Sequence, residues 1–239
     1  MFLKIKEGAV FLSDAHENSQ REGFYLFLKS LQKGDIKTSQ LFLMGDMFDL
    51  LVGEVDHTKR VYKKYIKLLN ELSKDMEIYY FEGNHDYNLS SLFENIKIFP
   101  LSKQPVIFGY KDKKIALLHG DIYAGLSYKI YSTIIRNSFI LKILNKIDLF
   151  LDNFISKKIL KNQKNKNICT KIKNFEDFIL KRVKFYKIES IDKICEGHYH
   201  QDRRFKFDEI EYINFPSFAC KGDYYQILGG EMKRCEGKR

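Results

Sequence analysis

The fold is decided by one short stretch, QLFLMGDMFD, at residues 40–49. Its apolar run from Leu41 to Met44 predicts a strand of a parallel sheet, because such strands are covered on both faces. The run stops at Gly45, which permits a sharp turn, and two carboxylates follow, Asp46 and Asp49. Open α/β folds bind ligands beyond the carboxyl ends of their strands, and a buried acid must be paired or bound to metal. The stretch therefore predicts an α/β fold with a polar site at this strand end.

Four other apolar runs end in a similar polar cluster. The clusters are Asp14-Ala-His16, Gly-Asn84-His85-Asp86, His119-Gly-Asp121 and Gly-His198-Tyr-His200. They contain five of the six histidines of the chain, whereas the sixth, His57, lies in a polar loop where we expect no role for it. A single histidine of this kind would be ordinary, but five at corresponding strand ends predict one shared site.

In this order, from Asp14 to His200, the five motifs resemble the calcineurin-like metallophosphoesterase family. The resemblance implies an α/β fold in which a two-sheet sandwich is flanked by helices and carries two metals at its strand ends. It implies that one metal is held by Asp14, His16, Asp46 and His200. It implies that the other is held by Asp46, Asn84, His119 and His198. Asp46 would then bridge the two ions.

The donor set also bears on the cofactor and the chemistry. Nitrogen and carboxylate ligands without cysteine suit Mn, Fe, Zn or Co, and we expect two divalent ions, with Mn²⁺ first among them. Such a pair, about 3.5–4 Å apart, polarises a phosphoryl oxygen and activates water for attack on phosphorus. By resemblance, His85 stabilises or protonates the leaving oxygen and Asp86 orients its ring. Asp49 is expected to support the ligands rather than to bind metal.

The remaining elements fit one large domain, for which 239 residues suffice. Helical spacing predicts helices over 17–34 and over 58–75, the second capped by Thr58, and a short helix over 90–95. Strands are expected over 106–110, 113–118, 209–218 and 224–232, the last two closing a second sheet. The core is expected to comprise residues 1–124 and 191–239.

Residues 125–190 form a basic insertion between the fourth and fifth motifs. The insertion contains 15 Lys and Arg against 5 Asp and Glu, a net charge of +10, which equals that of the whole chain. Its first half is amphipathic, and the run from Lys161 to Asn167 predicts a turn between two helical arms. The insertion is either a helical pair packed on the core with a solvated basic face, or a lid that holds an anionic, partly apolar substrate.

Within the family, a helical lid at this position resembles the UDP-2,3-diacylglucosamine pyrophosphohydrolases of lipid A synthesis. Tyr128-Lys-Ile-Tyr131 and Thr170-Lys171 resemble short motifs of that subgroup, so Tyr128, Arg136 and Lys171 are expected to bind substrate. The chain differs from the subgroup at His85, where Arg is usual, and at Tyr199, where Thr is usual. The resemblance implies hydrolysis of the diphosphate to lipid X and UMP by attack of a metal-bridging hydroxide on phosphorus.

Two rival functions remain. The basic insertion could bind nucleic acid for a metal-dependent phosphodiesterase or nuclease, although its broad apolar face argues against this. A non-catalytic scaffold is disfavoured because every expected ligand is present. We expect the partner to be an anionic nucleotide lipid, with no obligate protein partner.

Localisation and cysteine state can also be predicted. No signal peptide or apolar run of about 18 residues is present, so we expect a cytoplasmic protein in peripheral contact with the inner face of the membrane. The four cysteines, Cys169, Cys195, Cys220 and Cys235, are scattered and are expected to be free thiols.

Overall fold

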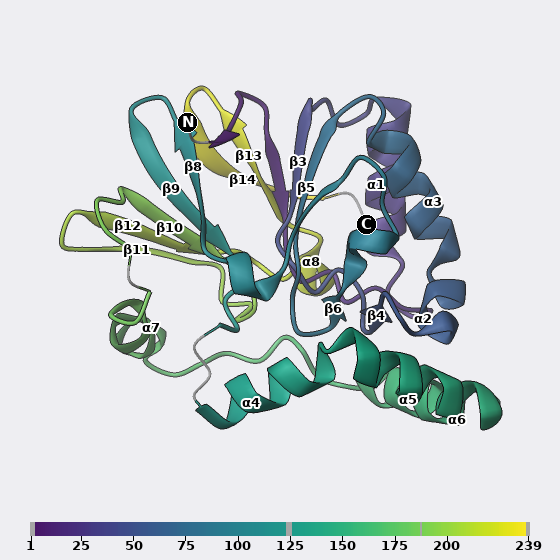
Figure 1. Cartoon of the computed structure of the whole chain (residues 1–239). Helices are drawn as coiled ribbons and strands as arrows, with labels where there is room; N and C mark the ends of the chain where they lie inside the picture. Colours follow the sequence, from purple (N-terminus) through teal and green to yellow (C-terminus); the bar gives the residue numbers. More distant parts are fainter. Residues whose placement is uncertain (1–2, 123–125, 187, 238–239) are drawn as a thin grey trace.

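Two six-stranded sheets pack face to face and are flanked by helices (Figure 1). The computed structural model describes residues 3–122, 126–186 and 188–237, with the backbone alone for 126–129. A two-stranded sheet, β4 (Leu51–Val52) with β6 (Asp86–Tyr87), lies at the same end of the molecule as the insertion helices. The predicted α/β two-sheet sandwich flanked by helices is confirmed.

The first sheet contains the strand around which the fold was predicted. Its order is β14-β13-β2-β3-β5-β7, and β3 pairs in parallel with both β2 and β5. The strands are β2 (Val10–Leu12), β3 (Gln40–Leu43), β5 (Glu77–Phe81), β7 (Lys97–Phe99), β13 (Tyr224–Leu228) and β14 (Glu231–Cys235). The predicted buried strand of a parallel sheet is therefore confirmed.

The second sheet has the order β1-β8-β9-β10-β12-β11. Its strands are β1 (Leu3–Lys4), β8 (Val106–Tyr110), β9 (Lys113–Leu118), β10 (Lys193–Glu196), β11 (Arg203–Phe207) and β12 (Ile210–Asn214). Strands β8 and β9 have the predicted bounds. The prediction that the last two runs close one sheet together was wrong, because β12 lies in this sheet and β13 in the first. Strand β11 was missed because no residue in it is fully buried.

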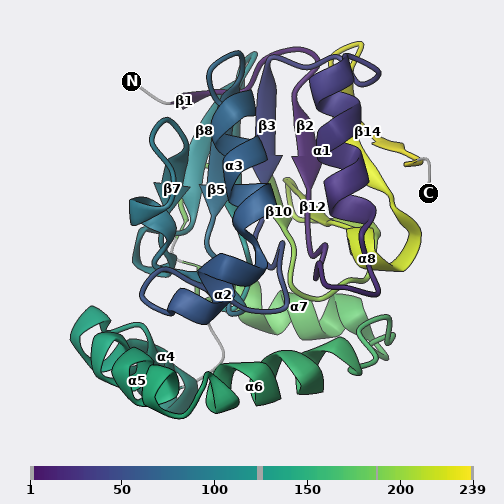
Figure 2. The same ribbon diagram turned by 90° about the vertical axis from the view of Figure 1, so that its right-hand side faces the viewer.

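The side chains of the apolar run of β3 pack into two different core layers, one on each face of the sheet. Leu41 and Leu43 face the helices α1 (Gly23–Lys33) and α3 (Lys63–Leu72), which cover the first sheet in Figure 2. Phe42 and Met44 face the other way, into an inner core shared with the second sheet. A strand covered on both faces is apolar throughout, which is why the run shows no alternation.

The helices on the first sheet differ from prediction at their starts. Helix α1 begins at Gly23 rather than residue 17, and it is capped by Gly34, which has φ 79° in the left-handed region. The second predicted helix is split into α2 (Asp56–Val61) and α3, and His57 lies in α2 rather than in a loop. Thr58 is not a cap: it is buried within α2 and its hydroxyl bonds to Val52 and Val55. The short helix predicted over 90–95 is a 3₁₀ turn, η1 (Leu89–Ser91).

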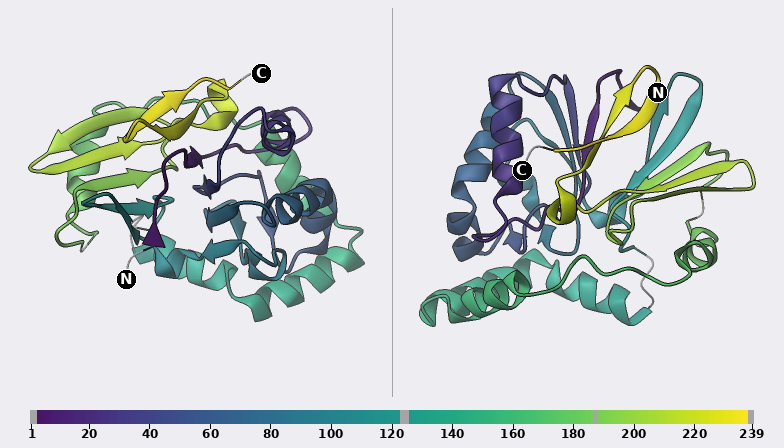
Figure 3. Two further views of the ribbon diagram at one scale, coloured as in Figure 1. Left: turned by 90° about the horizontal axis from the view of Figure 1, so that it is seen from above. Right: turned by 180° about the vertical axis from the view of Figure 1, so that it is seen from behind.

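The insertion forms four helices rather than two arms. They are α4 (Leu126–Ile135), α5 (Ser138–Phe150), α6 (Phe154–Lys164) and α7 (Phe175–Val183). Helices α4 to α6 lie along one end of the sandwich (Figure 3). The turn predicted from Lys161 was wrong in its first half, since α6 continues to Lys164 and an irregular return segment, residues 165–174, leads to α7. Helix α7 packs on the outer face of the second sheet through Phe175 and Ile179.

The prediction of four free thiols was wrong. Cys169 of the return segment forms a disulfide with Cys220 of α8 (Phe218–Lys221), whereas Cys195 and Cys235 are free. The pair is 51 residues apart in the sequence, and only the fold brings it together. Among the described residues, no helix combines the length and the apolar character that crossing a bilayer requires.

Candidate active site

The five motifs converge because their strands are neighbours. Strands β2, β3 and β5 lie side by side in the first sheet, and β9 and β10 lie side by side in the second. At their carboxyl ends, three groups of side chains place ligand atoms within 4.8 Å of one another. The groups are Asp14, His16 and His200; His16, Asp46 and His85; and Asp46, His119 and His198. The structure thus brings the carboxylates and histidines of the predicted metal site together, while their assignment as ligands stays a prediction.

The backbone at this site is unusual. Five predicted ligands have positive φ angles, between 42° and 64°, a region that non-glycine residues seldom adopt: Asp14, His16, Asp46, His198 and His200. Such conformations cost free energy and concentrate at functional sites. The neighbouring glycines make room for the ligands, since a Cβ at Gly83 would lie 2.2 Å from the Oδ1 atom of Asp46.

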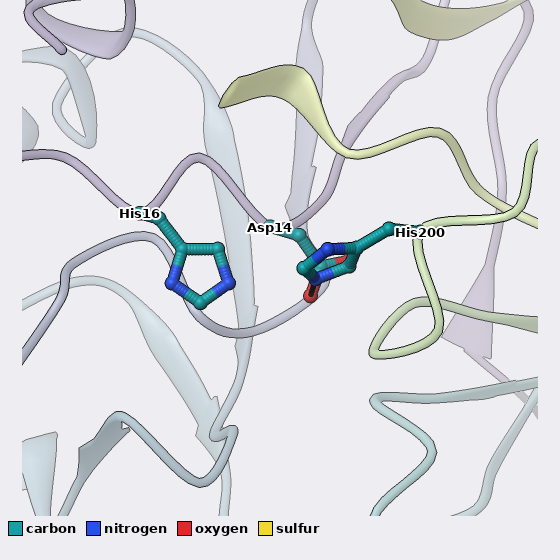
Figure 4. Close-up of side chains that lie close together, drawn as sticks. All are labelled: Asp14, His16 and His200. Carbon is teal, nitrogen blue, oxygen red and sulfur yellow. Dashed lines mark ion pairs between the residues drawn. The ribbon is translucent and has the colours of Figure 1, made fainter. Parts of the chain in front are cut away.

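Asp14 and His200 form the first part of the site (Figure 4). The His200 Nε2 atom lies 3.1 Å from Asp14 Oδ1, and the ring of His16 faces the same space. Asp14 is held by the Ser13 hydroxyl and by the backbone N–H of His198. The His200 Nδ1 atom lies 2.6 Å from the Ile168 carbonyl oxygen in the return segment. An Nδ1–H that donates to this carbonyl leaves Nε2 as the ligand atom.

Asp46 lies between the two halves of the site. Its Oδ2 atom is 3.4 Å from Nε2 of His119 and 4.0 Å from Nε2 of His16. Its Oδ1 atom accepts a hydrogen bond from the backbone N–H of His85. Asp46 therefore lies between a histidine of each sheet, and its role as a bridging carboxylate stays a prediction.

The donor set fits divalent metal. In the described structure, three buried ligand atoms have no hydrogen-bond partner: His16 Nε2, His119 Nε2 and Asn84 Oδ1. Buried polar atoms of this kind are costly unless something binds them. The Nδ1 atom of His119 faces the Met44 carbonyl at 2.8 Å, the arrangement that orients an imidazole toward a metal.

The electrostatics point the same way. Burial opposes the ionised form of Asp46, but His119 and the neighbouring histidines hold the pKa of the carboxyl well below its usual range. Burial likewise lowers the pKa of His119, and the Asp46 carboxylate outweighs it and raises this pKa well above normal. His198 differs, since burial and the charge of His119 lower its pKa to about 4. A cation bound here would compete with protonation of His119, because a histidine must be deprotonated to bind metal.

His85 and Asp86 do not form the predicted pair. The Nδ1 atom of His85 lies 2.8 Å from the backbone carbonyl oxygen of Asp49. The Asp86 carboxylate instead accepts hydrogen bonds from the Tyr80 hydroxyl and the backbone N–H groups of Asp46, Met47 and Gly83. The prediction that Asp86 orients the His85 ring was therefore wrong. The backbone carbonyl of Asp49 contacts the ring instead, and Asp86 stabilises the loop that contains Asp46. His85 also lies close enough to His16 and Asp46 to share a metal with them.

The three residues predicted to bind substrate are placed differently. Lys171 is exposed and donates to the Gln201 carbonyl at 3.3 Å, and its neighbours Thr170 and Ile172 line the hollow that contains His200. Arg136 is largely buried and contacts Glu82, Gly83 and Asp121. The side chain of Tyr128 lies outside the described residues.

Sequence reasoning missed supporting residues. The Gln104 side chain donates to the Glu82 carbonyl and accepts from the backbone N–H of His119. Asp49, predicted to support the ligands, lies 3.6 Å from His16 Nδ1 and accepts hydrogen bonds from Arg21. The Tyr199 hydroxyl, at the position where the chain departs from its subgroup, donates to the Gly120 carbonyl. No local sequence pattern indicates the roles of Gln104 and Arg21, because each contacts residues that are distant in the sequence.

Two neighbouring hollows share Asn84 and His85 in their walls. One, of about 220 Å³, is lined by His16, Asp46, His198 and His200 together with the return segment. The other, of about 390 Å³, continues under the insertion helices. Its apolar lining includes Leu50, Val52, Ile135, Leu141, Leu144, Ile155 and Ile159. We call the second hollow the apolar cavity.

A two-sheet sandwich with such a site defines a metal-dependent hydrolase. The model of the calcineurin-like phosphoesterase family matches residues 9–202. The chain therefore belongs to the calcineurin-like phosphoesterase family, as its motifs predicted.

Several relatives carry a more particular name. Proteins named UDP-2,3-diacylglucosamine hydrolase from Coxiella burnetii and Psychromonas ingrahamii are 24% identical over 197 and 199 residues, covering 80% of this chain and 80% of each relative. The one from Aliivibrio fischeri is 23% identical over 201 residues, covering 80% and 81%. Among solved structures, a phosphoesterase from E. coli aligns over 96% of this chain and 99% of its own, with a TM-score of 0.44 and 14% identity. An archaeal phosphodiesterase aligns over 95% and 98%, with a TM-score of 0.44 and 12% identity.

Proposed function

We propose that the protein hydrolyses the diphosphate of UDP-2,3-diacylglucosamine, giving UMP and the diacylglucosamine phosphate lipid X. The observation that carries the proposal is that the polar hollow and the apolar cavity are neighbours, with Asn84 and His85 in the walls of both. A substrate with a diphosphate beside acyl chains needs both environments next to each other. The names of the relatives favour the same substrate.

We assign the metal ligands and the general acid to different residues of the site. Asp14, His16, Asp46 and His200 would hold one ion, and Asp46, Asn84, His119 and His198 the other, with Mn²⁺ as the metal we propose. Bound divalent ions would supply Lewis acidity and lower the pKa of a water. The Asp49 carbonyl fixes Nδ1 of His85, so a protonated His85 can donate from Nε2 to the leaving oxygen.

The insertion would hold the lipid. The apolar cavity would take acyl carbon, each buried methylene contributing about 0.8 kcal/mol. Outside it, Phe139, Phe150 and Phe154 are strongly exposed on α5 and α6, where Lys142 and Lys157 are also exposed. Exposed aromatic side chains beside lysines suit the surface of an anionic bilayer, so peripheral contact with the inner membrane is part of the proposal.

One assay separates this function from the nuclease alternative. Purified protein with Mn²⁺ is given UDP-2,3-diacylglucosamine, bis-p-nitrophenyl phosphate and single-stranded DNA in parallel. We expect the highest kcat/KM on the nucleotide lipid, UMP as a product, and no turnover in EDTA. Higher kcat/KM on DNA, with strong salt dependence, would identify a nuclease instead.

A further inference from the structure

Arg136 reaches from the insertion into the core. It directly follows α4, yet its side chain is only 13% exposed. Its Nη2 donates to the Gly83 carbonyl at 2.8 Å and lies 3.4 Å from Asp121 Oδ2. Its Nη1 lies 3.7 Å from Glu82 Oε2, and the guanidinium stacks over the ring of Tyr87 at 5.0 Å.

These contacts join two loops that carry predicted ligands. The Gly83 carbonyl belongs to the peptide bond that leads into Asn84, at the end of β5 in the first sheet. Asp121 follows His119 by two residues, at the end of β9 in the second sheet. One guanidinium therefore connects the loop of the first sheet that leads into Asn84 with the loop of the second sheet that follows His119. Gln104 makes a second link between the same loops from within the core.

Arg136 also lines the apolar cavity, but the polar contacts of its guanidinium are with the protein. Glu82 and Asp121 are 2% and 1% exposed, and buried carboxylates need a cationic partner. The charge of Arg136 is thus matched by two carboxylates of the protein, and one of its donors is engaged by a backbone oxygen. Its planar fork suits several oxygens at once, which a lysine cannot reproduce.

We propose that Arg136 is a positioning residue that fixes the Asn84 and His119 loops for the second divalent ion. The inference rests on the proposed function, because it uses the same metal site. The insertion then has two roles, since it supports the metal centre as well as holding substrate. Loss of Arg136 should therefore weaken metal binding even when no lipid is present.

The test is a titration of the metal-free protein with Mn²⁺, followed by calorimetry, in wild type and three variants. Arg136→Ala removes the fork, and Arg136→Lys keeps the charge alone. Arg60→Ala is the matched control: Arg60 donates to Asn153 of the insertion at 2.9 Å but contacts no ligand loop in the described structure. Circular dichroism and melting establish that each variant is folded, and turnover of bis-p-nitrophenyl phosphate is measured beside binding.

We expect wild type and Arg60→Ala to bind two Mn²⁺ alike. Arg136→Ala should bind one of the two roughly 10–100-fold more weakly, the usual cost of losing a supporting partner. The kcat of Arg136→Ala on bis-p-nitrophenyl phosphate should also fall. Arg136→Lys should have a metal affinity between those of wild type and Arg136→Ala. If Arg136→Ala is folded and binds both ions with wild-type affinity, the inference is wrong. If Arg136→Ala does not fold, wild-type affinity for both ions in Arg136→Lys would overturn the inference instead. A wild type that binds no Mn²⁺ would overturn the proposed function as well.

Discussion

Single residues determine whether this site can hold metal. Asp46 has φ 53°, so its carboxylate is turned into the gap between the sheets instead of following the strand. Three histidines, His85, His119 and His200, have Nδ1 within 2.8 Å of a backbone carbonyl oxygen. Each therefore presents the same atom, Nε2, to the site. These contacts restrain the rings through the protein itself, and such preorganisation reduces the cost of binding an ion.

His85 is the residue whose role is most open to test. Replacing it with Ala should lower kcat by roughly 10²–10⁴, the usual contribution of a positioned acid or base, with metal content unchanged. The measurement is steady-state kinetics on the nucleotide lipid together with elemental analysis. His57→Ala is the matched control, since His57 lies on α2 outside both hollows. If His85→Ala loses metal, His85 is a ligand rather than an acid.

The side chains of the site could be predicted from the sequence, but their supports could not. Each ligand motif directly follows an apolar run, so Asp46 and His119 are marked by their own neighbours. The carbonyl that orients His200 belongs to Ile168, 32 residues away, and nothing in an isoleucine side chain indicates this use of its backbone. Asp86 was misassigned because its role was taken from the resemblance, whereas the turn directs its carboxylate toward Tyr80 and the Asp46 loop.

At the scale of elements, the insertion is attached to the core beside the predicted ligands. The return segment carries the Ile168 carbonyl, and Cys169 ties it to α8. The N–H of Ala219 in α8 donates to the Asp14 carbonyl at 3.2 Å. The disulfide thus connects the segment behind His200 with the helix behind Asp14.

Reduction of this disulfide should destabilise the protein. Cross-linking residues 51 apart removes loop entropy worth about 4 kcal/mol from the unfolded chain in the chain-entropy model. Dithiothreitol should therefore lower the Tm of the wild type, by thermal unfolding with and without reductant. The double variant Cys169→Ser with Cys220→Ser should already have the lower Tm and should not respond. Four titratable thiols in protein purified without reductant would contradict the cross-link.

The apolar cavity under helices α4 to α6 should affect binding of the lipid and not the chemistry. Leu144→Ser and Ile159→Ser each remove an apolar side chain from the apolar cavity. Each should raise KM for the nucleotide lipid roughly ten- to a hundredfold, from the 1.5–3 kcal/mol that a buried aliphatic side chain contributes. Turnover of bis-p-nitrophenyl phosphate should be unchanged. Ile134 of α4, by contrast, is 50% exposed and does not line this cavity.

Leu180→Ser is the matched control for these variants, because Leu180 is an exposed leucine on α7, away from the apolar cavity. It should behave as wild type on both substrates. Equal loss of both activities in folded Leu144→Ser would mean that the cavity does not bind acyl chains.

At the scale of the whole molecule, the site joins the two sheets. Asp14, Asp46 and Asn84 come from the first sheet, and His119, His198 and His200 from the second. Any ion that binds between Asp46 and His119 also holds the sheets together at this end. Metal should then stabilise the fold as well as the reaction.

Removal of metal should therefore lower the Tm. A ligand that binds only the folded state adds about 2.7 kcal/mol at a hundred times its Kd, or roughly 2–4 °C per kcal/mol for a chain of this size. Thermal unfolding in EDTA and in excess Mn²⁺ measures the difference, and Asp46→Asn should reduce it. An identical Tm in both buffers would mean that metal does not bridge the sheets.

The proposed chemistry depends above all on Asp46 bridging two ions at the junction of the sheets. Anomalous diffraction at the manganese edge, from crystals grown with Mn²⁺, tests this bridge most directly. We expect two peaks about 3.5–4 Å apart with the Asp46 carboxylate between them. A single peak, or two peaks of which only one contacts Asp46, would contradict it.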